Sequence, residues 1–167
     1  MKAKLIIEGK EFDIEINNPE LEKMIKPKKK TGYERVENGD VHYYDEGFRV
    51  AEDKDCYGSL DDEFYNGANY YSDKIVAENN TRADKLMRQL RRFAVEHRKT
   101  DLKWECCEVK KYCLRYEHDL KIIRVDYWYT SQAFGGIWFD SEEATKLAIQ
   151  TFYDELIWYF TEYKDSL

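Results

Sequence analysis

The sequence lacks several features that mark common classes of protein. No apolar run approaches the roughly 20 residues needed to span a membrane. There is no phosphate-binding glycine loop, no dinucleotide-binding fingerprint, no H-E-x-x-H helix and no G-x-S-x-G nucleophile turn. The three histidines, His42, His97 and His118, are not spaced as a metal-binding or nucleophile-activating pair. We therefore expect a protein without enzymatic activity.

Cysteine is also scarce, with four residues in the chain. The charged, alternating N-terminal stretch does not resemble a secretion signal, so we expect reduced thiols and a cytoplasmic location. One alternative assembles Cys106, Cys107, Cys113 and His118 into a metal site, but this set lacks the paired spacing of structural zinc sites. We expect ordinary buried or half-buried cysteines, and neither a metal nor a cofactor.

The chain is rich in aromatic side chains and its charge is unevenly distributed. Aromatic residues make up 16% of the sequence, and 14 of them are tyrosine. The net charge is −7, but residues 31–72 carry 3 basic and 11 acidic groups, whereas residues 73–99 carry 8 and 4. The acidic total disfavours general nucleic-acid binding, which needs Lys and Arg at the contact surface. It still allows one local basic surface.

The first sixteen residues alternate apolar and charged side chains around Gly9-Lys10, which predicts a β-hairpin with a two-residue turn. This register would place Ile7 opposite Phe12. A short helix is predicted to follow and to end before Pro27, because proline stops a helix. Residues 26–32 then read as a basic linker, for which a solvated tether is favoured over a phosphate-binding patch.

Residues 33–99 predict strands followed by a helix. A turn centred on Asn38-Gly39 and a strand in "GFRVAE" precede the acidic residues 52–64, which we expect to form a mobile loop. A long helix is predicted from Ser72 or Asp73 to about His97, with a basic outer surface. Its predicted inward stripe is Val76, Ala83, Leu86, Leu90, Phe93 and Ala94.

Residues 100–167 repeat this order. Two strands (110–116 and 120–129), a third strand in "GGIWF" and a last helix capped by Asp140 or Ser141 are expected. The side chains predicted to face inward on that helix are Ala144, Leu147, Ala148, Thr151, Phe152, Leu156, Tyr159 and Tyr163.

Two similar phrases, "YNGANYYSDKIVAE" and "FGGIWFDSEEATKLAI", support this duplication. Placing Gly67 on Gly135 superposes Tyr70-Tyr71 on Trp138-Phe139, each pair followed by a polar cap and a helical stretch. We favour a pseudo-repeat over coincidence. The predicted fold is α+β: an N-terminal β-hairpin and short helix (1–25), a linker, and a two-layer antiparallel-sheet and helix domain. That domain would consist of two strand-strand-strand-helix pseudo-repeats, 33–99 and 100–167, sharing one sheet around a common aromatic interior.

The chain resembles a group of small accessory proteins of bacteriophages, prophages and mobile elements. The "IIEGKEFDIEI" hairpin, the "KKKTGYERV" joint, "YNGANYYSDKIVAE" and "IWFDSEEATKLAI" carry the resemblance. Proteins of this group often bind host machinery, and some inhibit defence systems, including CRISPR nucleases. The resemblance therefore implies a non-enzymatic inhibitor in the host bacterial cytosol that contacts a defence effector, or its nucleoprotein complex.

Three surfaces are candidates for partner binding: the acidic segment, the basic helix surface and the segment "VDYWYTSQAFGG" (125–136). One or two of the three consecutive aromatics in that segment must lie away from the core. The candidate residues are Asp53, Asp55, Asp61, Asp62, Glu63, Arg88, Arg91, Arg92, Tyr127, Trp128 and Tyr129. Two alternative functions remain open. One is nucleic-acid binding through the helix surface over 85–99 together with Lys28–Lys30, and the other is self-assembly through the N-terminal hairpin.

Overall fold

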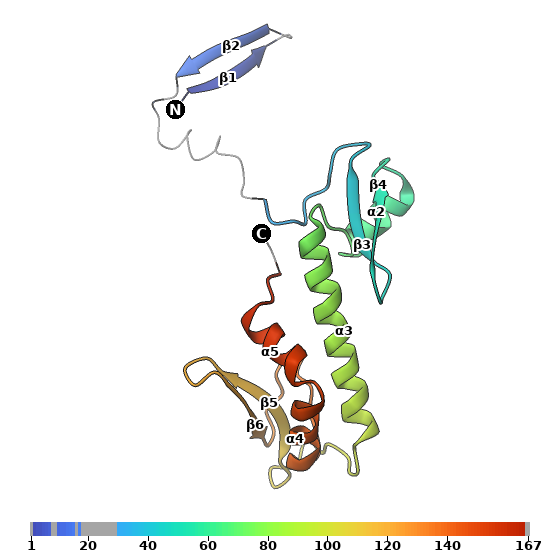
Figure 1. Cartoon of the computed structure of the whole chain (residues 1–167), viewed down its shortest axis with the longest axis vertical. Coiled ribbons are helices and arrows are strands. Elements are labelled where there is room, and N and C mark those ends of the chain that lie inside the picture. The colour runs from blue at the N-terminus through green and yellow to red at the C-terminus, as the bar shows by residue number, and fades with distance from the viewer. Residues whose placement is uncertain (1, 8–9, 16, 18–29, 166–167) are drawn as a thin grey trace. The chain divides into compact units, whose positions relative to one another are not determined.

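The structure is a computed structural model that describes residues 2–7, 10–15, 17 and 30–165. The chain divides into two compact units, Met1–Thr31 and Gly32–Leu167 (Figure 1). No helix in the described part of the chain is both long and apolar enough to cross a bilayer.

The first unit contains the predicted hairpin, formed by β1 (Lys2–Ile7) and the antiparallel β2 (Lys10–Glu15). The predicted register is wrong, because Ile7 pairs with Lys10 and Leu5 pairs with Phe12. Each residue of β1 pairs with a residue two positions earlier in β2 than expected. Leu5 faces an apolar residue in either register, so the apolar alternation does not distinguish the two. The predicted short helix and most of the basic linker lie outside the described residues.

The second unit begins with an antiparallel pair, β3 (Val41–Asp45) and β4 (Val50–Lys54), followed by α2 (Ser59–Asn66) and α3 (Lys74–Glu96). The turn at Asn38-Gly39 is present. The long helix is confirmed, and all six residues of its predicted inward stripe are buried.

The second half of this unit repeats the order with β5 (Lys111–Glu117), β6 (Ile122–Trp128), α4 (Glu142–Thr151) and α5 (Tyr153–Thr161). The first strand of each half also bonds to the residue that the repeat singles out. Tyr43 and Tyr71 exchange two backbone hydrogen bonds of 2.8 Å, and Tyr112 and Phe139 exchange bonds of 2.9 and 2.8 Å. Tyr71 and Phe139 are the residues that the sequence alignment superposes.

The helix that follows each bridge is capped at the equivalent position. The side chain of Asp73 accepts a hydrogen bond from the Val76 amide at 3.0 Å, and Ser141 accepts one from the Ala144 amide at 3.3 Å. In both halves the cap follows the bridge residue by two positions. The duplicated phrase therefore encodes a duplicated junction.

The expected single sheet is wrong, because β3–β4 and β5–β6 form separate two-stranded sheets. The third segment of each half contributes one bridge residue instead of a full strand. The helix cap lies only two residues later, so the chain leaves the sheet before a ladder can form.

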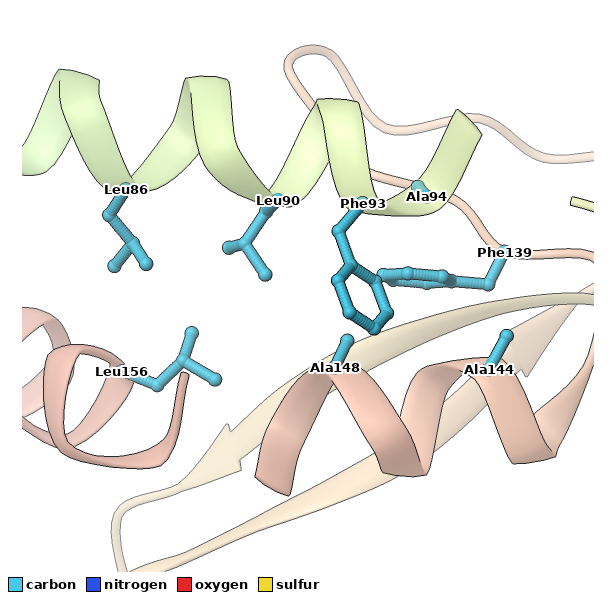
Figure 2. Close-up of a cluster of buried hydrophobic side chains, with 8 residues drawn as sticks. All are labelled: Leu86, Leu90, Phe93, Ala94, Phe139, Ala144, Ala148 and Leu156. Carbon is cyan, nitrogen blue, oxygen red and sulfur yellow. The ribbon is translucent and has the colours of Figure 1, made fainter. Parts of the chain in front are cut away.

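The expected common interior is also replaced by two clusters. Tyr71, Val76 and Ala77 form the smaller one, packed against Tyr43 and Val50. The larger cluster joins α3 to α4 and α5 (Figure 2). Its buried members are Leu86, Leu90, Phe93, Ala94, Phe139, Ala144, Ala148 and Leu156.

The predicted last helix is two helices that meet at Phe152, which has φ −112° and ψ 21°. Leu147 and Thr151 are exposed, contrary to the prediction, whereas Ala148 and Leu156 are buried as expected. The prediction assumed one continuous helix, and the break at Phe152 changes which side chains face inward before and after it. Phe152 itself packs edge-to-face on Phe93, with ring centroids 5.6 Å apart.

Candidate partner-binding surfaces

The acidic segment is not the mobile loop that the sequence suggested, because most of it lies in β4 and α2. Asp55 is fully buried. Its carboxylate accepts hydrogen bonds from Arg35 at 2.9 and 3.2 Å, from the Tyr70 hydroxyl at 2.8 Å and from the Tyr57 amide at 2.7 Å. The hydrogen bonds from Arg35 are the main cause that lowers the pKa of Asp55 to about 2. This carboxylate therefore stabilises the interior of the fold and is not available to a partner.

Two more predicted acidic residues are used within the fold. Asp61 is buried and accepts hydrogen bonds from the Cys56 and Gly58 amides at 3.0 and 2.9 Å, which caps the start of α2. Asp62 pairs with Arg35 at 2.5 Å. Asp53 and Glu63 are exposed. Of the five predicted carboxylates, these two have no ion pair among the described residues and remain available for contact with a partner.

The predicted basic surface is present on α3, since Arg88, Arg91 and Arg92 are all exposed. Two of the three are already engaged. Arg88 donates to the Gly47 carbonyl at 2.9 Å and lies 3.9 Å from Asp45, and Arg92 lies 3.6 Å from Glu96. Arg91 has no ion pair within the described residues.

The three consecutive aromatics are all exposed, which goes beyond the one or two that strand alternation requires. Tyr127, Trp128 and Tyr129 expose 45%, 48% and 39% of their surface. Phe134, in the loop that follows, is fully exposed. We call these four residues the aromatic surface. Tyr127 and Tyr129 contact each other with ring centroids 5.8 Å apart, whereas strand alternation directs Trp128 to the opposite face. Phe134 lies within the segment 125–136 that the sequence singled out, but it was not among the candidate residues, because it stands directly before Gly135-Gly136 where a strand was expected.

A groove of about 560 Å³ lies between the C-terminal part of α3 and the loops on either side of the β5–β6 hairpin. Arg91 and Arg98 contribute cations to its lining, together with Trp104 and Trp138. The two indoles meet edge-to-face with centroids 5.1 Å apart. The Trp138 Nε1 is buried and finds no acceptor among the described residues.

Asp140 holds the loop at this groove in place. Its Oδ2 accepts hydrogen bonds from the Lys99 and Thr100 amides at 2.6 and 2.8 Å. Burial would by itself raise the pKa of Asp140, but these bonds, with one from the Thr100 hydroxyl, outweigh it and the pKa is lowered. The loop that carries Arg98 is therefore tied to the bridge-and-cap junction of the second half.

Lys111 links the groove to the aromatic surface. It is fully buried, and its Nζ donates to the carbonyls of Cys106 at 2.9 Å and Tyr129 at 2.5 Å. The same Nζ lies 5.5 Å from the centroid of the Trp104 ring. One ammonium group thus connects the loop that bears Trp104 to the end of β6.

The alternative metal site is not assembled in the described residues, where no group of three or more His, Cys, Asp or Glu side chains converges. All four cysteines are free thiols. Burial raises the pKa of Cys113 to about 11, so this thiol stays protonated near neutral pH.

The fold and these surfaces define an α+β protein in which one type of sheet-helix junction occurs twice, at the start of α3 and at the start of α4, with exposed aromatic and charged surfaces in the second half. Comparison of the chain with protein-family profiles, with curated proteins and with solved structures found no match.

Proposed function

We propose that the chain is a non-enzymatic binding protein that contacts a partner protein through its aromatic surface. The exposure of Tyr127, Trp128, Tyr129 and Phe134 on consecutive parts of one segment carries the proposal. Exposed tryptophan and tyrosine are the residues that most often dominate the binding energy of protein interfaces. Four large aromatics left in water within eight residues favour such a contact over a purely structural role.

The partner class follows from the resemblance to phage accessory proteins. A host defence effector, with CRISPR nucleases as the first group to test, is the partner in this proposal. The exposed Asp53 and Glu63 would favour a basic surface of the partner of the kind that normally takes nucleic acid. The bound chain would then occupy that surface and inhibit the effector without chemistry of its own.

Co-purification with a panel of host nucleases, each with and without its guide RNA, tests the partner class. Calorimetry on any complex then tests the surface. Trp128→Ala combined with Phe134→Ala should weaken binding by about 30-fold or more, because loss of one hot-spot side chain removes about 2 kcal/mol.

A matched variant removes aromatic surface elsewhere. Phe48→Ala combined with Tyr153→Ala also truncates two exposed aromatic side chains and should leave binding within about 2-fold of wild type. Equal losses in the two double variants would argue against the aromatic surface. The absence of a complex with any member of the panel would argue against the partner class.

A further inference from the structure

We infer that the groove lined by Arg91, Arg98, Trp104 and Trp138 binds a segment of single-stranded nucleic acid. This site is separate from the protein contact proposed above and does not depend on it. The inference rests on three features: which basic side chains at the groove have no ion pair, which aromatic groups lie beside them, and how large the hollow is.

The arginines of α3 and of the loop that follows it fall into two sets. Arg82, Arg88 and Arg92 each lie within 4 Å of an acidic side chain. Arg91 and Arg98 have no ion pair in the described part of the chain. Paired arginines are largely neutralised toward an outside anion, whereas unpaired ones attract it.

Further unpaired cations continue this cluster. A second hollow shares Val95, Arg98 and Asp101 with the groove and adds Lys99 and Lys103 to the lining. Neither lysine has an ion pair among the residues that the structure describes. The adjoining hollows therefore contain four basic side chains and one acidic side chain, and an anionic occupant complements this charge.

The aromatic groups make a nucleotide a better occupant than a simple anion. Trp104 is half-buried and lines the groove, so part of its ring can stack on a base, whereas Trp138 is buried and packs edge-to-face on Trp104. Indole rings next to arginines are the combination that single-strand-binding proteins use, with bases stacking on the rings and phosphates pairing with the cations.

The dimensions favour a single strand over a duplex. A volume of about 560 Å³ falls in the range of pockets that enclose one small ligand. A duplex needs a broad line of free cations along its backbone, but Arg88 and Arg92 on the same helix are occupied. Four cations without an ion pair among the described residues, Arg91, Arg98, Lys99 and Lys103, line the groove and the adjoining hollow.

Fluorescence anisotropy of the full chain with a labelled oligothymidylate at low salt tests the inference. The wild-type chain should bind the single strand more tightly than a duplex of equal length. Arg91→Gln combined with Arg98→Gln should weaken binding by about 10-fold or more. It should also reduce the slope of log K against log salt by about 1.4, at about 0.7 per phosphate contact.

The matched variant is Lys85→Gln combined with Arg92→Gln, which removes the same charge from exposed positions of α3 outside the groove. It should bind within about 2-fold of wild type, and Trp104→Leu should weaken binding by about 10-fold through loss of stacking. Equal losses in the two double variants would overturn the inference. So would the absence of binding at low salt, or a duplex bound as tightly as the single strand.

Discussion

At the scale of single residues, Asp55 is the side chain whose contribution to stability follows most directly from its contacts. Its carboxylate is fully buried and is held by Arg35, Tyr70 and the Tyr57 amide. Asp55→Asn should lower the free energy of unfolding by about 3 kcal/mol, because Arg35 loses its buried anionic partner. Urea unfolding measures this loss. Asp53→Asn, at an exposed position of β4 two residues earlier, should change stability by less than about 0.5 kcal/mol.

The contribution of Asp55 should also depend on pH. Hydrogen bonds from Arg35 lower the pKa of Asp55 from its ordinary 3.8 to about 2 in the folded protein. A lowered pKa means that the stabilisation is complete above the unfolded value and is lost as the pH falls through the folded one. The difference between wild type and Asp55→Asn should therefore shrink from pH 4 to pH 2. A constant difference over this range would contradict the assignment.

His42 is the second residue with a testable energetic role. It is fully buried and stacks on Tyr70 with centroids 4.4 Å apart, yet neither ring nitrogen has a hydrogen-bond partner among the described residues. His42→Phe keeps the stacked ring and removes two unsatisfied polar atoms, so it should raise the free energy of unfolding by about 1 kcal/mol. Thermal unfolding checks this.

His42→Ala provides the comparison, because it removes the polar atoms and the ring together. It should destabilise the protein by about 3 kcal/mol through the cavity that it leaves. Destabilisation by both substitutions would mean that the histidine nitrogens have partners, such as ordered water.

At the scale of secondary structure elements, the local signals in the sequence were sufficient for α3 and for the start of α4, but they indicated neither α2 nor the break between α4 and α5. Asp73 and Ser141 cap the two helices, and the stripe from Val76 to Ala94 lies inside as its spacing predicted. These features depend on residues three or four positions apart. The duplicated phrase succeeded for the same reason, since bridge, cap and first helical turn lie within about six residues.

Features that depend on distant residues were not predictable. Asp55 was expected on a mobile acidic loop, but its partners Arg35 and Tyr70 lie 20 and 15 residues away in sequence. No local pattern shows that an acidic run will supply buried acceptors. The groove has the same origin, because it joins Arg91 to Trp104 and Trp138 through three separate segments. The division of the strands into two sheets also depends on pairing between residues far apart in the sequence, so local patterns did not predict it.

At the scale of the second unit, α3 contributes buried residues to the hydrophobic clusters of both halves. Val76 and Ala77 near its start belong to the cluster with Tyr71, and Leu86 to Ala94 belong to the cluster with α4 and α5 (Figure 2). A helix forms cooperatively along its length. We therefore expect the two clusters to unfold together, although they do not share a sheet or an interior.

The tryptophans make this expectation testable, because all four, Trp104, Trp128, Trp138 and Trp158, lie in the second half. Val76→Ala changes only the cluster of the first half and should destabilise it by about 2 kcal/mol. Cooperative unfolding would then lower the midpoint seen by tryptophan fluorescence by about 6 °C.

Ile75→Ala is the control for this experiment, since the neighbouring side chain is 65% exposed whereas Val76 is 2% exposed. The control should leave the fluorescence midpoint unchanged, because little apolar surface leaves the interior. Far-UV circular dichroism, which follows α3 directly, should give the same midpoint as fluorescence in each variant. A midpoint that moves in circular dichroism but not in fluorescence after Val76→Ala would show that the halves unfold separately.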